Sequence, residues 1–517
     1  MKRQSTMAHN TAQIPKANIP RSSFDRSHGK KLTMNAGDII PVLMDEAYPG
    51  DTFRCNPHGK VRLSSPLYDP IMDNMRFTLF FFSIPERLIW ENAQKFYGEQ
   101  ENPGDSIDFN IPTTQIPANA LTDAPLHHYL YETPATIPRA IDVSSLYARA
   151  YYKVYNDWFR DGNLQQSLNI DIDNGPDNYS DYVIQKRGKR HDYFTSCLPW
   201  PQRHDAQEVL IAQTATIAST GDMVFDDGAG NTGSITSPAA SIAANVTNLN
   251  MDGSLEYVSG LEADLSASGG TINQLRQSIM VQQMYETDAR GGARYIEIVK
   301  AHFNVTSPDL RATRAQFLGS ATVPINVHQV AATNEGGSVD LADLGAFVEA
   351  SFSKSGFTHS FTEHCIVLGV ACIDADLTYQ QGINRQYLRS DRLDKYWPKL
   401  ARIGEQAVTN DEIYVAATDD SGNQVFGYQE RYAELRYKPS TILGELNSTH
   451  SFPLDTWHLS EEFATPPKLN ADFIESNPPI SRVSRITTQD YFIADLWFEY
   501  ICARPLPLFG VPGALRF

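Results

Sequence analysis

The sequence offers no apolar run long enough to cross a membrane. The apolar stretch at residues 77–84 of this 517-residue chain has the length of a strand, whereas a membrane helix needs about 20 apolar residues. The Met-Lys-Arg start continues into polar residues, without the apolar segment of a secretory signal. We therefore expect neither membrane insertion nor classical secretion.

Cysteines are few, odd in number and widely spread, which argues against a disulfide framework and suits a reducing compartment. Cys365 and Cys372 lie within one apolar run, where a cysteine usually acts as a small buried hydrophobe. The five cysteines are Cys55, Cys197, Cys365, Cys372 and Cys502.

Basic side chains are outnumbered, 43 against 61 acidic ones, which gives a net charge of −18. Residues 1–31 reverse this balance with seven basic residues and one acid. A basic arm on an acidic body is typical of a chain that meets nucleic acid on one side, although a disordered leader without a partner has the same composition. The acidic total argues against a dedicated nucleic-acid enzyme. The DNA-facing candidates are Lys2, Arg3, Lys16, Arg21, Lys30 and Lys31.

A second basic cluster consists of Lys186, Arg187, Lys189 and Arg190. It could contact phosphates, and we treat it as a weaker DNA-facing candidate. It could equally pair with an acidic surface of a neighbouring molecule.

Residues 205–270 contain no Lys or Arg, nine acids and only two aromatic residues. Small polar residues dominate this segment, so it has few apolar side chains to bury. This composition predicts a long insertion that projects from the body. A disordered loop is the alternative interpretation. Short apolar runs at residues 208–217 and 242–246 indicate some strand content.

Elsewhere the patterns predict a mixture of strands and helices. Strict alternation predicts a central strand at residues 492–502 with even-numbered side chains in the core. Capping boxes and helical spacing predict helices. The further predicted strands are 76–83, 364–373 and 431–438, and the predicted helices are 85–98, 146–159, 271–291 and 295–303. Strands so far apart in the sequence suggest an antiparallel sandwich with large insertions.

No catalytic or cofactor-binding motif in the sequence has the structural context that its chemistry requires. The sequence GAGNTG at residues 228–233 matches a dinucleotide-binding glycine pattern, but no helical pattern follows it. Asp171, Asp173 and Asp177 could hold a hard cation, although their spacing does not fit an EF-hand and a solvated acidic turn is favoured. The His127–His128 pair, and His359 with His364, have no partners at metal-ligand spacing. We therefore predict no cofactor, no metal and no enzymatic site.

Several long motifs nevertheless resemble the major capsid protein of the gokushoviruses, the small tailless single-stranded-DNA phages of the microvirus family. They span residues 23–513 and leave only residues 205–270 unmatched, where that family carries a hypervariable insertion. The motifs are SFDRSHG, DEAYPGDTF, FFFSIPERLIWENAQKFYGEQ, YNDWFRDGNLQ, KRGKRHDYFTSCLPWPQ, TINQLRQ, DARGGARYIEIVKAHFNVTSPD, GFTHSFTEHC, ADLTYQQGINR, KYWP, VFGYQERYAELRYKPS, LDTWHLS and PLFGVPG.

The resemblance implies a mainly β protein, an eight-stranded antiparallel jelly roll with long helix-containing insertions between strands. The expected parts are a basic arm at 1–35, core at 36–204, a protruding insertion at 205–270, and core with a Pro-rich tail at 271–517.

The implied function is to build a T=1 icosahedral shell around circular single-stranded DNA, assembled in the bacterial cytoplasm. Copies of itself, a small basic DNA-packaging protein, a pilot protein, an internal scaffolding protein and a bacterial surface receptor are the implied partners. The insertion would cluster around a three-fold axis, with Asp222, Asp226, Asp227 and Asn231 as receptor-facing candidates. The alternatives are a carbohydrate-active β-sandwich enzyme and a host-binding spike.

Overall fold

The structure is a computed structural model that describes residues 20–206, 217–226, 232–235, 256–263, 272–305, 313–333, 344–416 and 424–509. The chain divides into two compact units. The larger unit combines Met1–Pro201 with Gly292–Phe517, and the smaller unit is Gln202–Gly291. No helix in the described ranges is long and apolar enough to span a bilayer.

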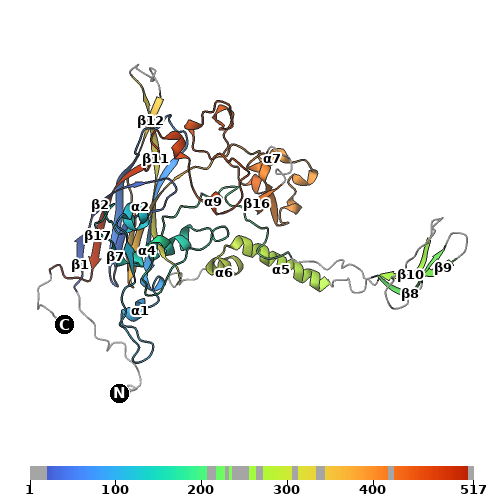
Figure 1. The fold of residues 1–517 in the computed structure, drawn as a ribbon, viewed down its shortest axis with the longest axis horizontal. Coiled ribbons are helices and arrows are strands. Elements are labelled where there is room, and N and C mark those ends of the chain that lie inside the picture. The colour runs from blue at the N-terminus through green and yellow to red at the C-terminus, as the bar shows by residue number, and fades with distance from the viewer. Residues whose placement is uncertain are drawn as a thin grey trace, which may run out of the picture. The chain divides into compact units, whose positions relative to one another are not determined.

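A ten-stranded antiparallel sheet forms the centre of the larger unit (Figure 1). Its main path runs β1-β17-β4-β12-β11-β5-β14-β3, while β2 pairs with β17 and β13 pairs with β4. The strands are β1 (Ser22–Asp25), β2 (His28–Met34), β3 (Ile40–Ala47), β4 (Thr52–Leu63), β5 (Met75–Pro85), β11 (Gln316–Ala331), β12 (Leu344–Ser353), β13 (Phe357–Ser360), β14 (Cys365–Ala375) and β17 (Phe492–Arg504).

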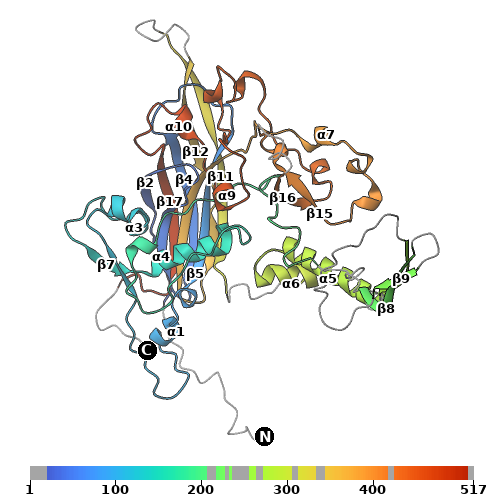
Figure 2. The ribbon, with the colours of Figure 1, turned by 45° about the vertical axis from the view of Figure 1, so that its right-hand side comes forward.

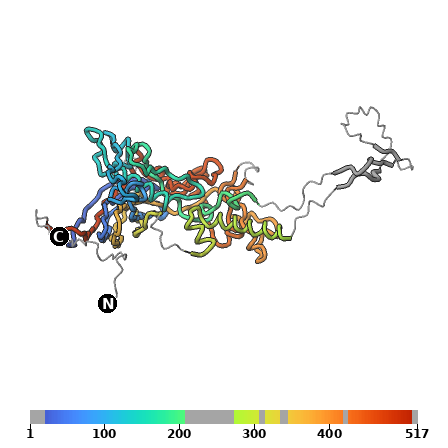
Figure 3. The backbone as a smooth tube through the Cα atoms, turned by 90° about the horizontal axis from the view of Figure 1, so that it is seen from below, coloured from blue at the N-terminus to red at the C-terminus, as the bar shows by residue number. Residues whose placement is uncertain are grey.

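The sheet curls so that its two halves share one hydrophobic core. Phe53, Val61 and Leu496 from the β17–β4 half join Phe77 and Val367 from the β5–β14 half in this core. Strands from the two ends of the chain lie side by side, as the blue and red segments of the tube show (Figure 3). The antiparallel, non-local arrangement confirms the predicted jelly-roll type of β-sandwich with long insertions.

Strand β17 follows the predicted alternation closely. Its even-numbered side chains from Phe492 to Cys502 are buried, while Ile493, Asp495 and Trp497 are exposed. β17 pairs with β4 on one side and with β1 and β2 on the other. It is therefore an interior strand, as predicted. The strands predicted at 76–83 and 364–373 are also confirmed, as β5 and β14.

Helix α4 (Leu146–Val154) covers the outer face of the β5–β14 half (Figure 2). Leu146, Ala150 and Val154 recur at a spacing of four residues and pack with Phe82 and Leu368 in a second core. The chain continues through one π-helical turn, Tyr155–Phe159, before the helix ends. Helix α3 (Pro125–Leu130) packs nearby against β3.

A third core stabilises the long connection between β14 and β17. In this core Phe194, Val408, Phe426 and Phe473 pack together. The other elements of the larger unit are α1 (Ala93–Phe96), α2 (Ala120–Asp123), α6 (Tyr295–Phe303), α7 (Arg385–Leu388), α9 (Ala471–Ile474), α10 (Ile480–Val483), β6 (Thr113–Ile116), β7 (Ile141–Ser144), β15 (Glu405–Thr409) and β16 (Val425–Glu430). Short 3-10 turns occupy Glu86–Leu88, Tyr179–Asp181, Arg392–Asp394, Pro398–Leu400, Asn410–Glu412, Ala433–Leu435, Gly444–Leu446 and Asp455–Trp457.

Two predicted elements of the larger unit are wrong. The helix predicted at 85–98 is replaced by the 3-10 turn and the short α1, because β5 continues to Pro85 in register with Cys365 of β14. The strand predicted at 431–438 is a loop with the 3-10 turn Ala433–Leu435. The predicted boundary of the basic arm at residue 35 also differs from the structure, since β1 and β2 belong to the central sheet.

The smaller unit contains one small sheet and one long helix. Strand β8 (Ile217–Asp226) pairs antiparallel with β9 (Thr232–Ile235) and β10 (Glu256–Ala263). The helix, α5 (Ile272–Gly291), has the extent predicted from its capping box and glycines. The apolar runs at 208–216 and 242–246 lie outside the described residues.

Candidate assembly and nucleic-acid surfaces

The Lys186–Arg190 cluster is held by acids of its own chain. Arg187 and Arg190 both pair with Asp374 at the end of β14, at 3.4 and 2.8 Å. Lys189 pairs with Glu461 at 2.6 Å, and Lys186 donates a hydrogen bond to Asn477 at 2.8 Å. These contacts fix the segment between β14 and the α9 region. Phosphate binding would have to displace them, so the cluster is a poor DNA-facing candidate.

The N-terminal candidates are divided between the described and undescribed parts of the chain. Lys2, Arg3 and Lys16 lie outside the described residues. Lys30 is largely buried and pairs with Glu132 at 3.1 Å, and this burial lowers the pKa of Lys30. Lys31 is exposed beside Asp495, at 3.6 Å. Arg21, directly before β1, donates hydrogen bonds to Thr52 and to the Ala503 carbonyl.

Arginine contacts join the two ends of the curled sheet. Arg26, next to β1, pairs with Asp45 of β3. Arg504, in β17, lies 3.6 Å from Asp45 and 3.4 Å from Asp51, and donates to the Glu46 carbonyl at 2.6 Å. Charged side chains at sheet edges oppose pairing with foreign strands. The sandwich therefore protects its edges with ion pairs.

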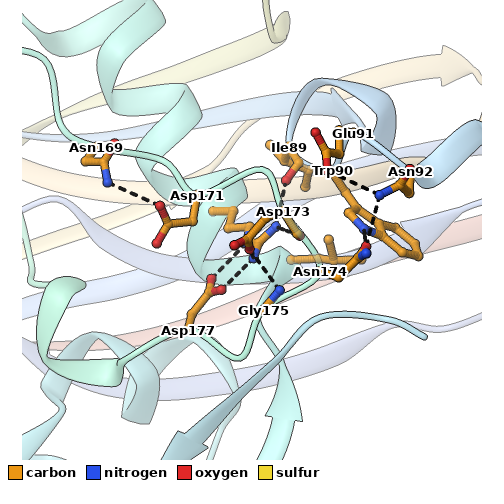
Figure 4. Close-up of polar contacts among 12 residues, drawn as sticks. Ile89, Trp90, Glu91, Asn92, Asn169, Asp171, Asp173, Asn174, Gly175 and Asp177 are labelled. Atoms are coloured by element: carbon orange, nitrogen blue, oxygen red, sulfur yellow. Dashed lines mark hydrogen bonds and ion pairs between the residues drawn. The ribbon is translucent and has the colours of Figure 1, made fainter. Parts of the chain in front are cut away.

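Two of the three aspartates of the possible cation site, Asp173 and Asp177, take part in a network around buried Arg149 (Figure 4). Arg149 donates to both carboxylate oxygens of Asp177, at 2.8 and 2.5 Å, and to the Asp173 carbonyl at 2.8 Å. The Tyr182 hydroxyl also donates to Asp177, at 2.7 Å, while Asp171 only accepts from a nearby amide. Across the described ranges, no three potential ligands gather as a metal site. The network is a structural anchor for the loop under α4.

The histidines occupy packing positions rather than a shared site. His127 is fully buried, stacks on Tyr131, and has its pKa lowered to about 4 by burial. His364 stacks on Tyr97 with ring centroids 3.6 Å apart. His359 contacts the ring of Phe361. These contacts favour the structural interpretation given to them from the sequence.

The outer face of the β17–β4–β12 half is different, because no helix of the described chain packs across it. Helices α3 and α4 instead lie on β3, β5 and β14. Large side chains consequently remain in solvent: the exposed fraction is 51% for Trp497 and 47% for Phe347. We call this surface the open face and define it by Trp497, Ile493, Phe347, Arg54, Lys60 and Arg62.

Cross-strand register places these residues together. Arg62 of β4 lies opposite Ile493 of β17 and Glu349 of β12. Lys60 lies opposite Asp495, and His58 lies opposite Trp497. Residues directly opposite in an antiparallel pair share one face at close Cβ spacing. The open face therefore interleaves cations with acidic, apolar and aromatic side chains.

Exposed apolar side chains also concentrate in the connection between β14 and β17. Tyr387, Leu443 and Phe452 are each at least 70% exposed there. Exposed apolar side chains that lie together mark sites of contact with other molecules. The connection is thus a candidate surface for contact with other molecules.

The receptor-facing candidates lie in the smaller unit. Asp222 and Asp226 are residues of β8. Asp227 and Asn231 lie outside the described residues, as does most of the GAGNTG pattern. Met223–Asp226 of β8 pair with Thr232–Ile235 of β9 in an antiparallel ladder.

Comparison with known proteins decides what kind of molecule carries these surfaces. A family model described as "Capsid protein (F protein)" matches residues 12–514. The chain belongs to this capsid protein family. Its relatives include capsid protein VP1 of Bdellovibrio phage phiMH2K, 40% identical over 98% of this chain and 97% of the relative. VP1 of Chlamydia phage 1 is 35% identical over 99% and 98%, and VP1 of Spiroplasma virus 4 is 32% identical over 100% and 99%.

These relatives confirm the resemblance to gokushovirus capsid proteins that the sequence motifs indicated. The capsid protein is a structural protein, and the alternative of a carbohydrate-active enzyme is wrong. Sequence reasoning missed the open face of the capsid protein. Its signal was present, because the same alternation that buries Leu496 directs Ile493 and Trp497 away from the core.

Proposed function

We propose that this capsid protein assembles with copies of itself into a closed T=1 icosahedral shell around circular single-stranded DNA. The observation that carries the proposal is the match to named capsid proteins over nearly the whole length of both chains. The exposed apolar side chains between β14 and β17 support it, because they provide surface that a lone subunit would leave in water. Assembly would take place in the bacterial cytoplasm, with an internal scaffolding protein.

The N-terminal leader would face the shell interior. Lys2, Arg3 and Lys16 occur in residues 1–19 without any acid, which suits contact with phosphates that is indifferent to base sequence. A small basic packaging protein and a pilot protein would share this compartment.

Residues 205–270 would project outwards, cluster around a three-fold axis and contact a bacterial surface receptor. The lack of any Lys or Arg among these residues supports this orientation. Nine acids facing polyanionic DNA would be repelled, and no ion pair to phosphate could form. A host-binding spike outside the shell is the remaining alternative, and it predicts small oligomers instead of closed particles.

Sedimentation and negative-stain microscopy of the full chain, produced in bacteria with its phage's scaffolding protein, test the proposal. We expect closed particles of uniform size. The double variant Leu443→Ser/Phe452→Ser should stay folded but fail to close shells, while the exposed control Ile107→Ser should assemble normally. Discrete small oligomers without closed particles would support the spike and contradict the shell.

A further inference from the structure

We propose that residues 505–509 of one copy of the chain dock in a groove beside α9 of the next copy. These five residues directly follow β17, and we call them the Pro-Leu segment. Leu508 and Phe509 would enter the groove and join neighbouring subunits head to tail. The inference rests on the proposed assembly of copies and names one contact that would hold them together.

The Pro-Leu segment leaves large apolar side chains in water. Its sequence, PLPLF, contains no charged residue. The exposed fraction is 52% for Leu506, 58% for Leu508 and 80% for Phe509. Its two prolines hold the backbone angle φ at about −65°, so the segment has few conformations to lose. A restricted segment binds at a lower entropic cost than a flexible one.

The groove has a lining that suits such side chains. Its volume is about 590 Å³, and α9 and the loop that precedes it form its walls. Phe463 and Phe473, which belong to the third core, line it together with the half-buried Pro466 and Pro467. Pockets walled by aromatic and proline side chains accept proline-containing segments. The groove also belongs to the connection between β14 and β17, where exposed apolar side chains concentrate.

The charges around the groove restrict its occupant further. Four acids and two lysines line it: Glu461, Glu462, Asp472, Glu475, Lys189 and Lys468. Lys189 already pairs with Glu461 at 2.6 Å, so acids predominate among the remaining groups. An acidic segment would be repelled, whereas the Pro-Leu segment has no acid. The lining therefore favours this uncharged apolar segment.

The groove and the start of the Pro-Leu segment lie at opposite ends of the central sheet. The segment starts after Arg504, which donates to the Glu46 carbonyl near the end of β3. Ser476, beside the groove, lies against Gly37, before β3 begins. Strand β1, next to the start of the segment, and α9 accordingly lie apart in Figure 1.

The Pro-Leu segment is too short to reach the groove of its own chain. Strand β17 runs between the two ends, from Phe492 opposite Met34 to Arg504 opposite Ser22. Its thirteen residues extend for about 40 Å at about 3.3 Å per residue. Five residues span at most about 18 Å. The groove that receives the segment must therefore belong to a second copy.

A contact between two different surfaces of the same chain is heterologous. Such contacts repeat from one copy to the next and close into rings when the rotation between copies allows it. An isologous dimer would instead bury the same patch on both copies. Head-to-tail docking of the Pro-Leu segment therefore suits the rings of subunits around the symmetry axes of a closed shell.

Disulfide trapping in assembled particles tests this contact. Ala464 lines the groove and is exposed, so Ala464→Cys and Phe509→Cys should both fold. The two variants are produced as separate full chains and assembled together with the scaffolding protein. The native cysteines are all buried and should not compete during oxidation. We expect cross-linked dimers on a non-reducing gel from the mixture only, and none when the exposed control Ile107→Cys replaces Ala464→Cys.

The double variant Ala464→Cys/Phe509→Cys distinguishes contacts within a chain from contacts between chains. Docking between copies should give a ladder of cross-linked multimers. A monomer with an internal disulfide would show that the segment folds back on its own chain and would overturn the proposal. Absence of cross-links in the mixture, or equal cross-linking by either single variant alone, would overturn it as well.

Assembly measurements provide an independent readout. Leu508→Ser/Phe509→Ser should raise the protein concentration at which half of the chain is assembled about a hundredfold, because two apolar side chains no longer gain from burial. Ala464→Trp fills the groove and should have a similar effect, while the exposed control Ala135→Trp should have none. Thermal melting identifies any variant that has lost its fold. Wild-type assembly by the folded Leu508/Phe509 variant would overturn the proposal, and if Ala464→Trp alone blocked assembly, a different segment would occupy the groove.

These outcomes separate the docking contact from the proposed shell. Closed shells without the cross-link would support the shell and remove the contact. Cross-linked head-to-tail oligomers that never close into shells would support the contact and contradict the shell.

Discussion

Replacing Leu496 by aspartate should prevent the larger unit from folding. Leu496 is 0% exposed in the middle of β17, and its side chain belongs to the core shared by both halves of the sheet. It packs directly over Gly59 of β4, where a Cβ would approach the Leu496 side chain to 3.0 Å. The site therefore has no room for a water molecule that could solvate a carboxylate.

The magnitude follows from two contributions. Truncation of a buried leucine to alanine costs about 2–5 kcal/mol, and an unpaired buried carboxylate adds several kcal/mol more. A typical domain has a free energy of unfolding of about 5–15 kcal/mol. Leu496→Ala should therefore fold with a lowered urea midpoint, and Leu496→Asp should give no soluble, folded protein.

Ile493→Asp is the matched control, because Ile493 lies in the same strand and points to the open face. It should fold with a nearly unchanged urea midpoint. Circular dichroism and urea titration of the three variants provide the measurement. A soluble Leu496→Asp protein with the wild-type midpoint would refute the placement of β17 in the core.

Other consequences concern buried charges and the insertion. Arg149→Met leaves Asp177 buried without its partner and should cost about 3–5 kcal/mol, read as a lower urea midpoint. Burial lowers the pKa of His127 to about 4, so the unfolded chain alone binds this proton below about pH 6.5. Stability should then fall between about pH 6.5 and 4, and His127→Gln should remove that part of the fall. Burial raises the pKa of Asp38 to about 6, so Asp38→Asn should stabilise the protein at about pH 7 and have little effect near pH 4. Replacing residues 222–237 by a short Gly-Ser linker should leave particle assembly intact and impair adsorption to the host, whereas failed assembly would make this segment a structural clasp.

The sequence was most informative where a local pattern and the tertiary environment agree. Alternation in β17 reflects burial on one side of a regular strand, and the apolar helical spacing of α4 reflects burial of nearly the whole helix, so both elements were predicted. The helix predicted at 85–98 starts from the capping pattern of Ser83 and Glu86. It is wrong because nine or more residues of β5 pair with both β11 and β14. Tertiary pairing of this extent outweighs a cap that contributes about 1 kcal/mol.

The charged clusters show the limit of sequence reasoning more directly. Lys189 and Arg190 form a conspicuous basic run, yet their partners, Glu461 and Asp374, lie more than 180 residues away. Arg54 and Arg62 are isolated basic residues in the sequence, although the fold places both on the open face. Only the three-dimensional structure shows which of these basic side chains form ion pairs with acids of the same chain.

A reconstruction of particles formed by the full chain tests the account most directly. It should show a closed T=1 shell in which Leu443 and Phe452 of every subunit are buried against a neighbouring subunit. A closed shell in which Leu443 and Phe452 remain in solvent would contradict the contact role proposed for the connection between β14 and β17. The absence of any closed shell would contradict the function proposed for this capsid protein.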